Sequence, residues 1–347
     1  MKKLIILLLF IPALLIGQTE KIMSYDGKVM SYGGKILSYD IEDQSDYFIT
    51  EWTLPTAGNF TFPAGNTTGY DAEINFGDGS GWKVITAYND ADLTNNYALA
   101  GVYTVKIRGA FPYIYINNGA VKTYLTEIVQ WGDIGITKLT NGFYGANKAT
   151  GNIIIPSGMT TISQSAFYNC NKLTGDGESL IPNGIICILA TAFSHDSALT
   201  GNLIIPDSDT LIGNYAFRNC VGFDSLKLSV NLNTLGISSF ERFNGSGTLD
   251  LYNTKIKSIP SKCFYYCTNF TKLYLPTDLT DIAADAFNYS SGITVVHCYA
   301  AAAPTVGING LRFLGTARPI HVPVGATGYD VAPWTTTSIF SEIIFDL

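Results

Sequence analysis

Charged residues are scarce in this chain of 347 residues. Only 14% are Asp, Glu, Lys or Arg, and the 28 acidic residues outnumber the 21 basic ones, which gives a net charge of −7. Nucleic-acid-binding proteins meet the phosphates with clustered Lys and Arg. The composition therefore argues against a nucleic-acid partner, whereas an apolar content of 47% is ample for packed cores.

Histidines are few, and the common catalytic motifs are missing. His195, His297 and His321 lie far apart in the sequence and show neither HxxxH nor HExxH spacing. The chain also has no GxSxG elbow, Walker loop or GxGxxG motif. We therefore predict no enzymatic activity, no catalytic residue, no metal site and no cofactor.

Long apolar runs are limited to one, at the N-terminus. Residues Leu4 to Ile16 follow Met1-Lys2-Lys3 and precede Gly17. A charged start, an apolar run and a small residue are typical of a secretory signal peptide, which we assign to residues 1–17; a buried N-terminal element is the alternative. The run is too short to span a bilayer. We therefore expect a secreted or cell-surface protein with no transmembrane segment in its mature chain.

Phenylalanine recurs with an almost constant period in the second half of the chain. The steps between successive members are 24, 26, 24, 23, 24 and 23 residues for Phe143, Phe167, Phe193, Phe217, Phe240, Phe264 and Phe287. A period of this size predicts a solenoid, in which neighbouring coils cover each other's apolar sides. The predicted fold is mainly β: a parallel solenoid of about seven coils of 23–26 residues over 132–300, followed by a C-terminal cap over 301–347.

The residues around each Phe repeat a longer pattern, x-Ile-Pro-x-x-x-Thr-x-Ile-x-x-x-Ala-Phe-x-x-Cys-x-x-Leu. Its clearest copies begin at Ile155, Ile205 and Ile259. This pattern resembles the BspA-like leucine-rich repeat, a family of secreted and surface proteins. The resemblance implies a short parallel strand in each coil, a tight turn at the Ala-Phe-x-x-Cys segment, an internal ladder of Phe rings and a role in binding or adhesion.

The six cysteines do not form an obvious disulfide framework. Cys170, Cys220 and Cys267 each follow a repeat Phe by three residues and fall in alternate coils. Stacking at about 4.8 Å per coil separates them by about 10 Å, beyond the roughly 7 Å limit for a bridge, so we predict free, buried thiols. Asp196 occupies the Cys position in another coil. We expect its carboxylate to point outward or to bend the turn, because an unpaired buried charge is costly.

The segment 18–44 consists of near-copies of seven residues that begin at Lys21, Lys28 and Lys35. Asp-Gly and Gly-Gly separate short β-favouring runs, which indicates strands with hairpin turns or a loosely ordered spacer. A dedicated binding motif with exposed Tyr is the alternative.

Residues 45–131 show short alternating strands with glycine turns, at 47–52, 73–76, 103–107 and 113–116, which predicts a small β-sandwich. The turn Phe76-Gly77-Asp78-Gly79 and the later Gly101 to Val105 strand resemble the polycystic kidney disease (PKD) domain, although Trp is common where this chain has Phe76. We expect Asp78 to bond its own turn. A calcium site with Asp71 or Asp90 is the alternative.

One face of the predicted strands is the candidate ligand-binding surface. Side chains alternate along a strand, so if Leu226 and Leu228 point inward, the outward residues of successive coils are Ile154, Leu180, Ile204, Lys227, Asp250, Tyr274 and His297. The first three are apolar. Either the β-sandwich folds back over them, or this concave face binds a partner.

The function we predict is secreted or cell-surface binding or adhesion, with an extracellular protein or a glycan as partner. A carbohydrate-binding component of a polysaccharide-handling system is the alternative, since an aromatic content of 13% suits contacts with sugars. A structural role in an envelope or a phage-like particle is a third possibility, suggested only by the seven-residue repeats.

Overall fold

The computed structural model describes residues 22–23, 30–32, 35–37, 43–313, 317–335 and 340–347. The chain divides into two units, Met1–Ser45 and Asp46–Leu347. In the first unit, β1 (Ile22–Met23), β2 (Met30–Tyr32) and β3 (Lys35–Leu37) form an antiparallel sheet in that order. Each strand falls in one copy of the seven-residue repeat. The predicted signal peptide lies outside the described residues.

The second unit opens with two antiparallel sheets that pack through aromatic side chains. Trp52 contacts Phe60 and Phe62, with ring centroids 4.9 and 5.5 Å apart. The larger sheet has the order β10-β4-β9-β6-β7, and β5 pairs with β8. These strands are β4 (Phe48–Leu54), β5 (Gly58–Thr61), β6 (Asp71–Asn75), β7 (Trp82–Ile85), β8 (Thr94–Tyr97), β9 (Gly101–Ala110) and β10 (Leu125–Gln130). The 3-10 helices η1 (Ala91–Leu93) and η2 (Ala120–Thr123) lie in the connections. The strand predicted at 113–116 is wrong, because Tyr113 and Ile114 form only isolated bridges.

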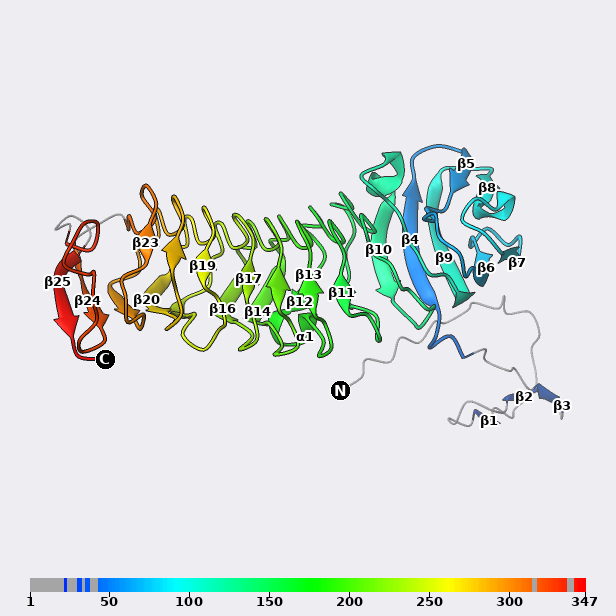
Figure 1. The fold of residues 1–347 in the computed structure, drawn as a ribbon. Coiled ribbons are helices and arrows are strands. Elements are labelled where there is room, and N and C mark those ends of the chain that lie inside the picture. Colours follow the sequence, from blue (N-terminus) through cyan, green and yellow to red (C-terminus); the bar gives the residue numbers. More distant parts are fainter. Residues whose placement is uncertain (1–21, 24–29, 33–34, 38–42, 314–316, 336–339) are drawn as a thin grey trace. The chain divides into compact units, whose positions relative to one another are not determined.

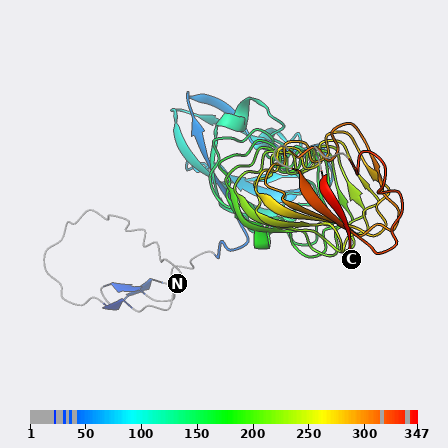
Figure 2. The same cartoon turned by 90° about the vertical axis from the view of Figure 1, so that its left-hand side faces the viewer.

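The rest of the unit is a parallel β-solenoid of about eight turns (Figure 1), and only 4% of the described residues are helical. Figure 2 looks along the coils from their C-terminal end. Each coil has three sides: the strand face, a side of two-residue strands, and the turn that carries the Phe. The strand face comprises β12 (Gly175–Asp176), β14 (Leu199–Ile204), β16 (Phe223–Lys227), β18 (Gly247–Asp250), β20 (Phe270–Leu275), β22 (Val295–Cys298), β24 (Arg318–Val322) and β25 (Phe340–Phe345). The second side comprises β11 (Thr161–Ile162), β13 (Cys187–Ile188), β15 (Leu211–Ile212), β17 (Thr234–Leu235), β19 (Ser258–Ile259), β21 (Asp281–Ile282) and β23 (Thr305–Val306).

The phenylalanine ladder predicted from the period is confirmed. From Phe143 to Phe287 the rings stack with centroids 5.4 to 5.6 Å apart and interplanar angles of 2 to 11°. A further coil follows residue 300, where the sequence predicted a cap. There Leu311 takes the Phe position, since the Phe287 amide donates to the Gly310 carbonyl as Phe264 donates to Ala286. The Phe period does not reveal this coil, because Leu stands at the Phe position.

A ladder of backbone hydrogen bonds holds the turn side together. In the coil of Phe217, the amides of Tyr215, Phe217 and Asn219 each donate to the next coil, at 2.8 to 2.9 Å. Tyr215 and Asn219 reach these acceptors with φ of 59° and 57°. Left-handed backbone is costly for residues other than glycine. The repeated inter-coil bonds offset that cost in every turn.

The β-sandwich packs on the first coil, at the N-terminal end of the solenoid, and does not cover the strand face. Strand β10 contributes a parallel bridge between Glu127 and Thr150 of the first coil. Trp131, which follows β10, packs on Phe143 at 5.3 Å and donates its Nε1 hydrogen to the Asn152 carbonyl at 2.6 Å. Ile154 is 53% exposed. The alternative in which the sandwich folds back over the first coils is therefore wrong.

Three coils carry a Cys three residues after the repeat Phe, and Asp196 stands at this position in another coil, where its orientation was predicted wrongly. All six cysteines are free thiols, and Cys170 and Cys220 donate from Sγ to carbonyls of the preceding coil, both at 2.9 Å. Asp196 points inward instead of outward and is fully buried. Its Oδ1 accepts from the Cys170 amide at 2.7 Å. Burial raises the pKa of Asp196 well above its ordinary value, so the carboxyl tolerates the interior as a neutral acid.

Candidate functional site

The strand face places most of the predicted outward residues as expected. Asp250, Tyr274 and His297 are direct neighbours on β18, β20 and β22, and Ile204 lies beside Lys227 on β14 and β16. Leu180 is the error: it is buried, at the end of the short helix α1 (Gly177–Leu180). Asp176 caps that helix by accepting from the Glu178 amide at 3.2 Å. This cap turns the chain into a helix where the repeat predicts a strand.

Five rings gather at the C-terminal half of the strand face, and we call them the aromatic cluster: Tyr252, Tyr274, His297, Tyr299 and His321. Tyr274 meets His297 edge to face at 4.8 Å, Tyr252 lies 4.3 Å from Tyr299, and His297 stacks on His321 at 4.6 Å. Tyr252, Tyr299 and His321 were not among the residues predicted from the sequence. Two of them could have been found, because they follow Asp250 and His297 by two residues and so share their face.

The two imidazoles present their edges outward. His297 and His321 are register partners on β22 and β24, with an interplanar angle of 13°. Rings that stack from strand to strand turn their faces toward each other and their edges toward solvent. The Nδ1 atom of His297 is buried without a hydrogen-bond partner among the described residues. Its Nε2 is therefore the nitrogen left to contact a ligand.

The electrostatics keep one imidazole neutral and anchor the other. Burial, the neighbouring His321 and Lys272 lower the pKa of His297. His321 bonds through Nδ1 to both carboxylate oxygens of Asp346, at 2.9 and 3.0 Å. Burial and the nearby phenols raise the pKa of Tyr299, so its hydroxyl is a donor at neutral pH. His297 and Tyr299 thus present uncharged polar groups at neutral pH.

The aromatic cluster combines hydrogen-bonding groups with the surfaces of aromatic rings. Within the described residues, no three or more His, Cys, Asp or Glu side chains are placed to hold a metal ion. The exposed edges supply phenol and imidazole hydrogen-bonding groups, and Lys227 and Asp250 flank them with opposite charges. Amphipathic rings of this kind are enriched at protein interfaces.

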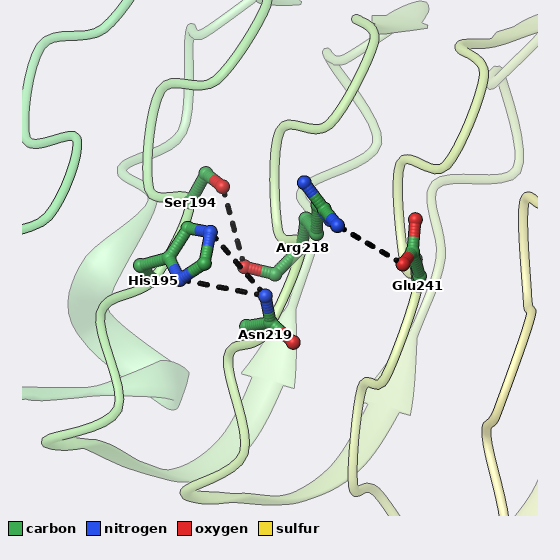
Figure 3. Close-up of polar contacts among 5 residues, drawn as sticks. All are labelled: Ser194, His195, Arg218, Asn219 and Glu241. Atoms are coloured by element: carbon green, nitrogen blue, oxygen red, sulfur yellow. Dashed lines mark hydrogen bonds and ion pairs between the residues drawn. The ribbon is translucent and has the colours of Figure 1, made fainter.

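A second polar group lies on the turn side, where Figure 3 shows side chains of three consecutive coils. Arg218 pairs with Glu241 at 3.2 Å, and the Asn219 amide lies 3.3 Å from His195 Nε2. Burial and the positive charge of Arg218 lower the pKa of His195. Each contact joins one coil to the next. We therefore assign these residues to cohesion between coils.

Neighbouring residues of the sandwich donate hydrogen bonds to the Asp78 carboxylate in the turn. Partial burial opposes ionisation, but hydrogen bonds from Ser80 and Asn95 prevail and lower the pKa of Asp78 to about 2. Asp90 instead caps η1 and bonds Thr86. The turn prediction is supported, and the carboxylates proposed as calcium ligands do not form a metal-binding group in the described chain.

Comparison with known families agrees with the coil geometry. Residues 137–201 and 187–301 match the BspA type leucine rich repeat region, in six copies. The solenoid is a BspA-type leucine-rich repeat region. These matches lie outside the sandwich, and its PKD-like resemblance stays a prediction.

The solved structures that are similar to the chain include two bacterial leucine-rich proteins, both at low identity. One is a leucine rich cell surface protein from Faecalibacterium prausnitzii, with 12% identity, a TM-score of 0.32, and coverage of 82% of this chain and 95% of that one. The other is a leucine-rich repeat protein from Bacteroides ovatus, with 14% identity, a TM-score of 0.19, and coverage of 80% and 99%. A search of curated proteins finds no match. Across the described ranges, every helix falls short of the length and apolarity of a membrane span.

Proposed function

We propose that this BspA-type repeat protein is a secreted or cell-surface binding protein whose strand face contacts an extracellular protein or glycan. The aromatic cluster carries the proposal. It places five partly exposed rings, each with a polar atom, on or directly after strands of the five-stranded sheet β18-β20-β22-β24-β25. Rings of this kind supply large contact area and hydrogen bonds together.

The repeat architecture favours such a role energetically. The rings stand on strands whose register is set by parallel pairing, and two of them are held by ring stacking and by the Asp346 carboxylate. A surface that is ordered before binding loses less conformational entropy on association. The sandwich, which packs on the first coil through Trp131, serves in this proposal as an N-terminal cap and spacer.

The experiment is capture of surface proteins and glycans with the full chain, followed by affinity measurement with variants. Lys227→Ala combined with Tyr274→Ala should weaken binding at least tenfold, because contact aromatics dominate interface energies. The melting temperature should not change, since neither side chain is in the core. The matched control is Lys262→Ala with Tyr266→Ala on the turn side. Equal effects of the two pairs, or no effect of the first, would contradict the proposal.

A carbohydrate partner is the second candidate, favoured by the close Tyr252–Tyr299 pair and its hydroxyls. A glycan array with the intact protein separates the candidates. Binding of defined glycans that is lost in Tyr252→Ala supports the carbohydrate function. A blank array together with a captured protein supports the protein function.

A further inference from the structure

The second side of the solenoid is open between its first two coils. A cavity of about 470 Å³ lies there, between Gly135–Thr137 of the first coil and Ser157–Thr161 with Ser163 of the second. Strand β11 belongs to the second coil and is the edge strand of its sheet, whose order is β11-β13-β15-β17. We call this cavity the edge slot.

Hydrogen bonds that close the later coils are missing at the edge slot. In the third coil the Cys187 and Leu189 amides donate to the carbonyls of Thr160 and Ile162. Thr161 and Ser163 are the corresponding residues of the second coil. Within the described chain, neither amide has a backbone acceptor in the first coil. In a parallel strand these amides and the Thr161 carbonyl point toward the slot.

The first coil is hydrogen-bonded to the sandwich on its N-terminal side. The Thr137 and Lys138 amides both donate to the Pro112 carbonyl, at 3.0 and 3.2 Å, as the Asn233 and Thr234 amides of a later coil donate to the Thr210 carbonyl. The other two sides stay closed: the Phe143 amide donates to Ala166 at 2.8 Å, and the Thr174 amide donates to Gly151 at 2.8 Å. The edge slot is therefore an opening on one side of the solenoid, between two coils that are hydrogen-bonded to each other on the other two sides.

We propose that the edge slot binds an extended segment of a partner polypeptide, which adds to β11 as a strand. The slot is lined by backbone, hydroxyl groups and the apolar side chains of Ile136 and Met159, with no charged side chain. Such a lining suits a neutral ligand with carbonyls and amides at strand spacing, which is what an extended peptide offers. The volume falls within the range of ordinary ligand sites.

The slot is distinct from the aromatic cluster, so this inference does not depend on the proposed function. Strand addition derives its affinity from main-chain hydrogen bonds, and its specificity from the side-chain pockets. The short Ser and Thr side chains at the slot leave room for small or aliphatic side chains of the partner strand.

The test uses the full chain and a blocked, uncharged heptapeptide with the sequence of residues 231–237. In the protein, this segment supplies β17, which pairs in parallel with β15. Calorimetry should show saturable binding, and hydrogen exchange at the Thr161 and Ser163 amides should slow at least tenfold. A peptide with alternate backbone nitrogens methylated should bind at least tenfold more weakly. Protected amides in the free protein, or equal binding of the methylated peptide, would overturn the proposal.

Two protein variants complete the test. Thr161→Pro removes a backbone hydrogen that the fold does not use, at an edge position where proline is tolerated. It should abolish peptide binding and keep the wild-type melting temperature. Cys187→Pro is the matched change one coil along, and should lower the melting temperature because that amide is bonded. An equal drop in melting temperature in both variants would show that the Thr161 amide is hydrogen-bonded in the fold, and the proposal would be wrong. Self-association of the free protein that Thr161→Pro abolishes would identify a second copy as the strand donor.

Discussion

Asp196→Cys, which restores the residue of the repeat, should stabilise the protein at neutral pH and not in acid. Asp196 is fully buried, and its Oδ2 has no hydrogen-bond partner in the described structure. Burial raises the pKa of this carboxyl, so the folded protein retains a proton that the unfolded chain releases above its ordinary pKa of 3.8.

The sign and size of the effect follow from proton linkage. Between pH 3.8 and the raised pKa, the folded state binds more protons than the unfolded state, so the free energy of unfolding falls as pH rises, by about 1.4 kcal/mol per unit. The free energy that this proton costs at pH 7 is therefore set by how far the folded-state pKa lies above 3.8. The variant loses the bond from the Cys170 amide, worth about 1 kcal/mol. We expect the variant to be less stable than the wild type, by up to about 1 kcal/mol, near pH 4, and its relative stability to rise toward pH 7 by about 1.4 kcal/mol for each pH unit over which the folded carboxyl stays protonated.

The assay is urea unfolding of the wild type and the variant at pH 4 and pH 7. Cys220→Ser is the control, because it changes the same repeat position without adding a group that titrates in this range. Its effect should be equal at the two pH values. A difference between Asp196→Cys and the wild type that does not change with pH would show that Asp196 is ionised in the folded protein, and would refute the reasoning.

Three further outcomes test the coil register. Phe217→Ala should lower the free energy of unfolding by about 3–5 kcal/mol, because the ring is buried between two others, and Phe287→Ala should cost less beside the tilted Phe313; small and equal shifts in melting temperature would contradict the ladder. Thiol labelling of denatured, unreduced protein should count six free cysteines, and two or fewer would mean that bridges form. Leu311→Ala should cost about 2–5 kcal/mol if Leu311 is a core residue of a further coil; chemical denaturation that shows no loss would assign it to a peripheral cap.

The sequence was most informative where residues repeat. The Phe period and the Ala-Phe-x-x-Cys pattern predicted the ladder, the coil size and the parallel strands, because a solenoid imposes one environment on each equivalent position. The same regularity explains the errors. Leu180 was placed by alignment, yet Asp176 caps a local helix. Asp196 was expected to point outward because its carboxyl was treated as charged, whereas a protonated carboxyl can be buried. Leu311 was missed because the period was followed through Phe residues alone.

The candidate site was only partly predictable. Alternation identified Asp250, Tyr274 and His297 as outward neighbours, but the reach of Tyr252 across a coil to Tyr299 depends on side-chain packing. His321 lay in the segment assigned to the cap. The edge slot had no sequence signal, because Thr161 and Ser163 occupy repeat positions whose amides are hydrogen-bonded in the third coil.

The most direct test of the central claim is the dissociation constant of a captured partner, measured by titration calorimetry for two matched pairs of variants. Tyr252→Ala with Tyr299→Ala removes two rings of the aromatic cluster, and Tyr265→Ala with Tyr289→Ala removes two rings of the turn side. The first pair should weaken binding at least tenfold, which corresponds to about 1.4 kcal/mol or more, and the second should leave it unchanged. Weakening by the turn-side pair alone would move the interaction away from the strand face and contradict the account.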